Sequence, residues 1–142
     1  MQSKQEKRQD FLRDLIAHLM THPVQTTQCA NATDDEVRQF IMLFMEPTMS
    51  RFNHDITSYG LKHIAERTIG HLFYGSDNYH YVSNDQFKRV INETGHFFRK
   101  QSSHNSPNDI YCFRWREGAE DVFYALGVHG TNKRGILQER DL

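Results

Sequence analysis

Two helix-start signals of the same kind constrain the fold more than any other feature of this chain. Residues 33–36 read Thr-Asp-Asp-Glu, and residues 83–86 read Ser-Asn-Asp-Gln. In such a capping box the hydroxyl accepts from the backbone N–H three residues on, while the acidic or amide side chain reaches back. A helical stripe of apolar residues follows each box: Val37, Phe40, Ile41 and Phe44 after the first, and Phe87, Val90 and Ile91 after the second.

Apolar spacing predicts three further helices. The first spans residues 4–21 and stops before Pro23, because proline disfavours the helical conformation of the residue before it. The second begins near Thr57 or Ser58, and we expect Gly70 to end it. The third is short, spans residues 117–126 and ends at Gly127.

Aromatic and β-branched runs predict a small amount of strand. Residues 71–82 contain a Gly-Ser-Asp-Asn turn between aromatic clusters, which favours a short strand or a small hairpin. Residues 96–115 are expected to form a hairpin. In its second strand Ile110, Cys112 and Arg114 share a partly exposed face.

The expected fold class is therefore α+β and mostly helical. Residues 1–127 are expected to form one globular domain, with the helix at 4–21 added to a core over 33–116 and followed by the helix at 117–126. Residues 128–142 have little apolar periodicity and are interpreted as a tail. We expect the helix at 4–21 to dock on its own core or to pair with its twin in a homodimer.

From residue 34 onward, helices followed by a hairpin are typical of a winged helix-turn-helix domain. The helix at 83–94 would lie in the major groove and the hairpin at 96–115 would be the wing. Asn reads adenine edges, while Lys and Arg read guanine or hold phosphate. The predicted DNA-binding residues are Asn84, Lys88, Arg89 and Asn92 on the helix and Arg99, Lys100, Arg114 and Arg116 on the wing.

The same residues are also typical of a small α+β domain that does not bind DNA. Lys88 and Arg89 are also typical of a solvated helix face. In addition, the segment 71–82 between the two helices is longer than a tight helix-turn-helix turn allows. Small α+β domains without DNA contacts also end in a helix and a hairpin.

No motif of enzyme chemistry is present, so we expect a non-enzymatic protein without a cofactor or metal site. The chain has no H-E-x-x-H, C-x-x-C or G-x-S-x-G motif and no glycine-rich phosphate loop. His63 and Glu66 are three residues apart on a predicted helix, and surface packing is the interpretation we favour for them. Cys112 is expected to be a small buried hydrophobic residue.

Charge leaves DNA binding open. The 142 residues hold 17 Lys and Arg against 18 Asp and Glu, which gives a net charge of −1. The positive charges outnumber the negative ones only in the middle, over residues 51–116. No apolar stretch is long enough to span a membrane, and no apolar segment of a secretory signal follows the first residues, so a cytoplasmic protein is expected.

Two segments resemble a known group of proteins. Residues 57–67 read TSYGLKHIAER, and residues 81–88 read YVSNDQFK, with Gly95 further on. Together they are similar to small uncharacterised proteins of phages, plasmids and other mobile elements of Gram-positive bacteria, over about a quarter of the chain. That resemblance implies a setting and no mechanism. In this setting small non-catalytic proteins regulate transcription, assist replication or block a host defence system.

Two functions are therefore expected. The first is a DNA-binding accessory or regulatory protein of a mobile element, with double-stranded DNA as the partner. The alternative is a protein-binding inhibitor of a host defence protein, of the anti-CRISPR or anti-restriction type. Aromatic residues are common at protein interfaces, and the candidates are Tyr59, Phe73, Tyr74, Tyr79, Tyr81, Phe97, Phe98 and Trp115.

Overall fold

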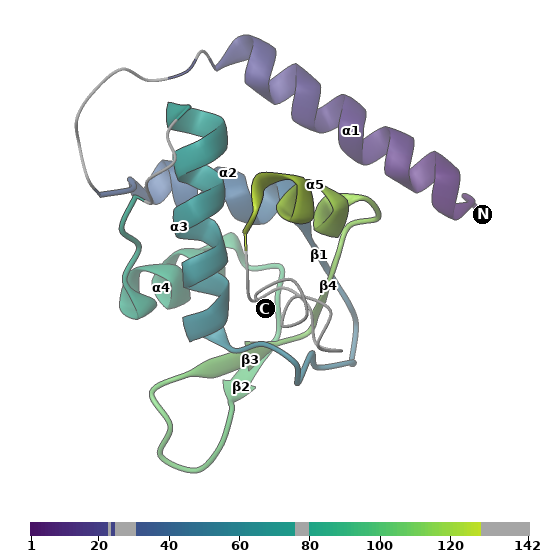
Figure 1. Ribbon diagram of the computed structural model, residues 1–142. Helices are drawn as coiled ribbons and strands as arrows, with labels where there is room; N and C mark the ends of the chain where they lie inside the picture. Colours follow the sequence, from purple (N-terminus) through teal and green to yellow (C-terminus); the bar gives the residue numbers. More distant parts are fainter. Residues whose placement is uncertain (23, 25–30, 76–79, 129–142) are drawn as a thin grey trace.

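Three helices form the centre of the molecule and each contacts the other two (Figure 1). They are α2 (Asp34–Phe44), α3 (Ser58–Tyr74) and α4 (Asn84–Thr94). The computed structural model describes residues 1–22, 24, 31–75 and 80–128. The core between the helices is built from the predicted apolar stripes, and Phe40, Leu61 and Phe87 in it are fully buried. Burial of such stripes is the main source of stability for short helices.

The capping box at the start of α2 forms as predicted. The Thr33 hydroxyl accepts from the Glu36 N–H at 3.1 Å, and the Glu36 carboxylate accepts from the Thr33 N–H at 2.8 Å. The box at α4 is only half made, because Ser83 accepts from the Gln86 N–H at 2.9 Å while the Gln86 side chain turns elsewhere. Its amide donates to the Ala32 carbonyl at 3.1 Å, so it joins the starts of two helices.

Helix α1 (Lys4–Thr21) has the predicted bounds and lies along one side of the molecule (Figure 1). It docks on the core through Phe11 and Leu15, which are buried. On a neighbouring face Leu12, Ile16 and Met20 are exposed at spacings of four residues. Docking of α1 on its own core is therefore observed.

Helix α3 is longer than the prediction, and the expected end at Gly70 is wrong. The helix continues to Tyr74, and Gly75 caps it in the left-handed conformation at φ 61°. A glycine inside a helix costs about 1 kcal/mol relative to alanine. One further turn buries Phe73, which outweighs that cost. The predicted strand over 71–82 is wrong for residues 71–74, and residues 76–79 lie outside the described part of the chain.

The predicted hairpin exists in a shorter form. Strands β2 (Arg99–Gln101) and β3 (Asp109–Tyr111) pair antiparallel, with Lys100 opposite Ile110. The chain then changes partner: β4 (Phe113–Trp115) pairs antiparallel with β1 (Met45–Pro47), a strand that directly follows α2.

Cys112 is the residue at which the chain changes partner. Its N–H donates to the Phe98 carbonyl at 2.9 Å, and its carbonyl accepts from the Thr48 N–H at 3.1 Å. The hairpin that was predicted to be the wing therefore ends at residue 111, and the placement of Arg114 and Arg116 on it is wrong. The expected partly exposed face is also wrong for Ile110 and Cys112, which are buried because both sides of this strand are covered.

Helix α5 (Ala119–Leu126) follows and ends at Gly127, as predicted. Val128 is fully buried and its N–H donates to the Phe123 carbonyl at 2.9 Å, so the packed core extends one residue into the predicted tail. Residues 129–142 lie outside the described part.

These elements confirm an α+β fold that is mostly helical. The winged helix-turn-helix assignment stays a prediction. Among the described residues, no helix combines the length and the apolar composition that crossing a lipid bilayer requires.

Candidate functional site

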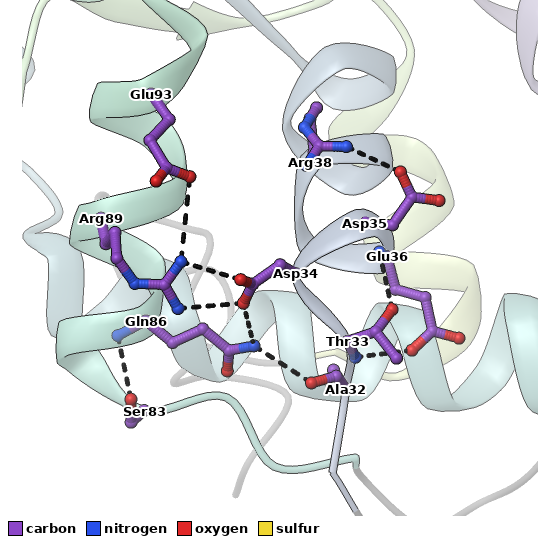
Figure 2. Close-up of polar contacts among 10 residues, drawn as sticks. All are labelled: Ala32, Thr33, Asp34, Asp35, Glu36, Arg38, Ser83, Gln86, Arg89 and Glu93. Atoms are coloured by element: carbon purple, nitrogen blue, oxygen red, sulfur yellow. Dashed lines mark hydrogen bonds and ion pairs between the residues drawn. The ribbon is translucent and has the colours of Figure 1, made fainter.

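The predicted groove-reading residue Arg89 is exposed, but its guanidinium is paired with a carboxylate of the same chain. Its two terminal nitrogens contact the two carboxylate oxygens of Asp34 at 2.8 and 3.0 Å, and Gln86 donates to the same carboxylate at 3.0 Å (Figure 2). These hydrogen bonds, that from Arg89 first, lower the pKa of Asp34 to about 2. Arg89 thus connects α4 to the beginning of α2.

Two other predicted residues of α4 contact the loop of the hairpin. The Asn84 amide donates to the Asn108 side chain at 3.0 Å, and the Lys88 ammonium donates to the Pro107 carbonyl at 2.7 Å. Asn92 is exposed. The helix face predicted to enter a DNA groove is therefore largely occupied by contacts within the chain.

The predicted phosphate-binding residues are engaged in a similar way. Arg99 lies 3.5 Å from the Asp109 carboxylate, and the Lys100 ammonium lies 4.5 Å from the centre of the Phe52 ring. The remaining two arginines pair with carboxylates of β1 and α1: Arg114 with Glu46 at 2.6 Å, and Arg116 with Asp14 at 2.8 Å. The structure does not bring the eight predicted residues together on one unpaired basic face.

A second group of charged residues, which the sequence analysis did not single out as a site, lines a hollow beside α3. The hollow has a volume of about 270 Å³ and is lined by Lys62, His63, Glu66, Arg67 and Tyr81. Four of these lie on one face of α3, because positions three and four apart are neighbours on a helix. Tyr81 comes from the extended segment that leads into α4. We call these five residues, together with Tyr59, the α3 site.

Glu66 is the centre of the α3 site, and the interpretation of this residue as surface packing is wrong. It is only 3% exposed. One carboxylate oxygen accepts from Lys62 Nζ at 3.3 Å and from the Val82 N–H at 3.0 Å, and the other lies 2.9 Å from His63 Nδ1. Its charge is therefore compensated inside the protein, and it fixes both Lys62 and the segment that carries Tyr81.

Lys62 is a buried cation between two exposed aromatic rings. The residue is 7% exposed, whereas Tyr59 and Tyr81 are 52% and 47% exposed. The ammonium lies 5.5 Å from the ring centre of Tyr59 and 5.0 Å from that of Tyr81, within range of cation–π attraction. Tyr59 also meets the His63 ring edge-on at 4.5 Å.

Arg67 completes the charge of the site. It is exposed, and its side chain forms no hydrogen bond or ion pair to any residue in the described part of the chain. With Lys62, Arg67 and Glu66 charged, the site carries a net positive charge. The sequence contained one signal for this arrangement: Tyr59, Lys62, His63, Glu66 and Arg67 recur at helical spacing.

The remaining candidates from the sequence are the metal-ligating residue types, the two cysteines and the interface aromatics. Within the described ranges no three His, Cys, Asp or Glu side chains are placed to hold a metal ion. Cys112 is buried, as expected, while Cys29 and Tyr79 lie outside those ranges. Among the predicted interface aromatics, Phe73 is buried, whereas Phe98 is exposed like Tyr59 and Tyr81.

Comparisons with protein-family models, with curated proteins and with solved structures give no match to this chain.

Proposed function

We propose that this protein binds nucleic acid through the α3 site and acts as a non-enzymatic accessory or regulatory protein of a mobile element. The observation that carries the proposal is the placement of Lys62, a buried cation, between two half-exposed tyrosines at a hollow that Arg67 also lines. Cations and aromatic rings in one concave site are the two components that bind phosphates and bases.

The donors of the site support phosphate binding. An ammonium group has three N–H donors, and Lys62 forms one hydrogen bond in the described structure, to Glu66. The exposed guanidinium of Arg67 presents a planar set of donors that suits phosphate oxygens. Because the charge of Glu66 offsets that of Lys62, Arg67 supplies the net positive charge of the site.

The proposal moves nucleic-acid contact away from α4. Arg89, Lys88 and Asn84 would each have to leave an internal partner before they could contact a base or a phosphate. In the described part of the chain Arg67 has no such partner, whereas Lys62 is itself bonded to Glu66 and would bind an anion with its remaining N–H groups. The α3 site therefore supports nucleic-acid binding better than the predicted recognition helix does.

Binding of the intact chain to fluorescently labelled oligonucleotides at two salt concentrations tests the proposal. We expect binding that weakens as salt is raised, because phosphate contacts release condensed counterions. Two phosphate contacts give a shallow dependence, with a slope of about −1.4 to −1.8 in a plot of log affinity against log salt. Absence of binding to single and double strands at low salt would overturn the proposal.

The alternative function, inhibition of a host defence protein, is favoured by a different observation. Leu12, Ile16 and Met20 form an exposed apolar row on α1. Rows at this spacing are the usual contact between an amphipathic helix and a helix of a protein partner. If the protein bound no nucleic acid, α1 would be the surface on which to seek such a partner.

A further inference from the structure

We infer that the α3 site takes single-stranded rather than duplex nucleic acid, with bases stacked on Tyr59 and Tyr81 and a phosphate held at Lys62 and Arg67. The inference rests on the proposed function and names its substrate class. The number of cations, the exposure of the tyrosines and the fixed backbone that carries them each support it.

The number of cations at the site is too small for a duplex binder. A strong duplex binder makes about six to ten phosphate contacts with Lys and Arg. The α3 site offers Lys62 and Arg67, with His63 as a third donor when it is protonated. The other cations of the predicted DNA-binding set are engaged within the chain, as Arg89 is with Asp34. The remaining affinity must therefore come from contacts other than phosphate.

The exposed tyrosine rings supply such a contact. Each ring uses part of its surface for the Lys62 ammonium, and about half of each residue remains exposed to solvent. Bases of a duplex are stacked on each other and offer only their edges, whereas an unpaired strand offers its ring faces. Aromatic side chains bind those faces without requiring a particular sequence. Two half-exposed rings beside cations therefore favour a single strand.

The two tyrosines are held in place before any ligand arrives. The Tyr81 carbonyl accepts from the Ala32 N–H at 3.0 Å, and the next residue, Val82, donates to Glu66. Tyr59 lies in the first turn of α3, and its ring lies against the His63 ring. Rings on a backbone that is already fixed lose less conformational entropy when a base stacks on them.

The test compares two labelled probes by fluorescence anisotropy: an oligo(dT) strand of about twelve nucleotides, within the usual site size of such proteins, and a duplex of the same length. We expect the strand to bind at least about tenfold more tightly than the duplex, and the double variant Tyr59→Leu/Tyr81→Leu to lose about tenfold or more of that affinity, as base–aromatic stacking predicts. Tyr59→Phe/Tyr81→Phe should retain it, because the stacking faces remain.

Tyr124→Leu is the matched control, since Tyr124 is an equally exposed tyrosine on α5. Equal binding of strand and duplex, with the leucine variant unchanged, would overturn the inference and leave the proposed function standing. Competition by thymidine 5′-monophosphate as effective as that of the strand would also overturn it, because the site would then serve a nucleotide. Failure of both probes to bind would overturn the proposed function itself.

Discussion

The guanidinium of Arg89 and the carboxylate of Asp34 form a two-point contact, with nitrogen–oxygen distances of 2.8 and 3.0 Å, that joins α4 to the first residue of α2 (Figure 2). Asp34 also lies at a helix N-terminus, where a negative charge is favourable. A residue predicted to contact DNA thus stabilises the packing of two core helices.

The pair predicts a stability change at acid pH. The folded pKa of Asp34 is about 2, below its ordinary value of 3.8. The contact therefore contributes stability above pH 3.8, and that contribution is lost as the pH falls toward 2. Urea unfolding of the wild type and Asp34→Asn at several pH values checks this. We expect the difference between them to shrink across this window, and a constant difference would contradict the assignment.

Substitution of Lys88 and Arg89 should lower the stability of the fold slightly and leave oligonucleotide binding unchanged. Lys88→Ala with Arg89→Ala removes the contacts to Pro107 and Asp34. We expect a small drop in the thermal midpoint, because contacts of exposed side chains are screened by solvent, and the same affinity for an oligonucleotide. A large loss of affinity in a folded double variant would return nucleic-acid contact to α4.

Glu66 should be among the residues most important for stability. Glu66→Ala leaves the Lys62 charge and the Val82 N–H buried without an acceptor. Breaking a buried ion pair in this way costs about 3–5 kcal/mol in free energy of unfolding. The double variant Lys62→Met/Glu66→Met should recover part of this loss, because neither charge remains while the Val82 N–H still lacks its acceptor. Chemical denaturation of the wild type, the single variant and the double variant measures these free energies of unfolding. A loss of less than about 1 kcal/mol for the single variant would show that the pair is solvated.

Substitution of Tyr111 should have the opposite effect on stability: removal of its polar group should not destabilise the protein. Its ring is fully buried, and its hydroxyl has no hydrogen-bond partner in the described part of the structure. Burial raises the pKa of this hydroxyl above its ordinary value. Tyr111→Phe removes a buried polar atom, so the free energy of unfolding should stay the same or rise by up to about 1 kcal/mol. A clear decrease in the urea midpoint would reveal a partner for the hydroxyl.

Features set by neighbouring residues were predictable from the sequence. The start of α2 follows from Thr33 and Glu36, whose bonds span one turn, and the bounds of α1 follow from apolar spacing and Pro23. The end of α3 was not predictable in this way. It depends on the burial of Phe73 against the rest of the core, which local propensity does not contain.

Features that depend on residues distant in sequence were missed. The change of strand partner at Cys112 requires β1, which lies far earlier in the chain. The same holds for the α3 site: helical spacing brings Lys62 and Glu66 together, but only the fold places Tyr81 beside them. The burial of Glu66 likewise depends on the segment that carries Val82.

The measurement that tests the central claim most directly compares oligonucleotide binding by Arg67→Ala and Arg13→Ala. Both changes remove one exposed positive charge; Arg67 lines the α3 site, whereas Arg13 lies on α1 and pairs with Asp10 on the surface. We predict that Arg67→Ala weakens binding by about tenfold. The slope of log affinity against log salt should fall by the amount of about one phosphate contact. Arg13→Ala should bind like the wild type. Equal affinities of the two variants would contradict nucleic-acid binding at the α3 site.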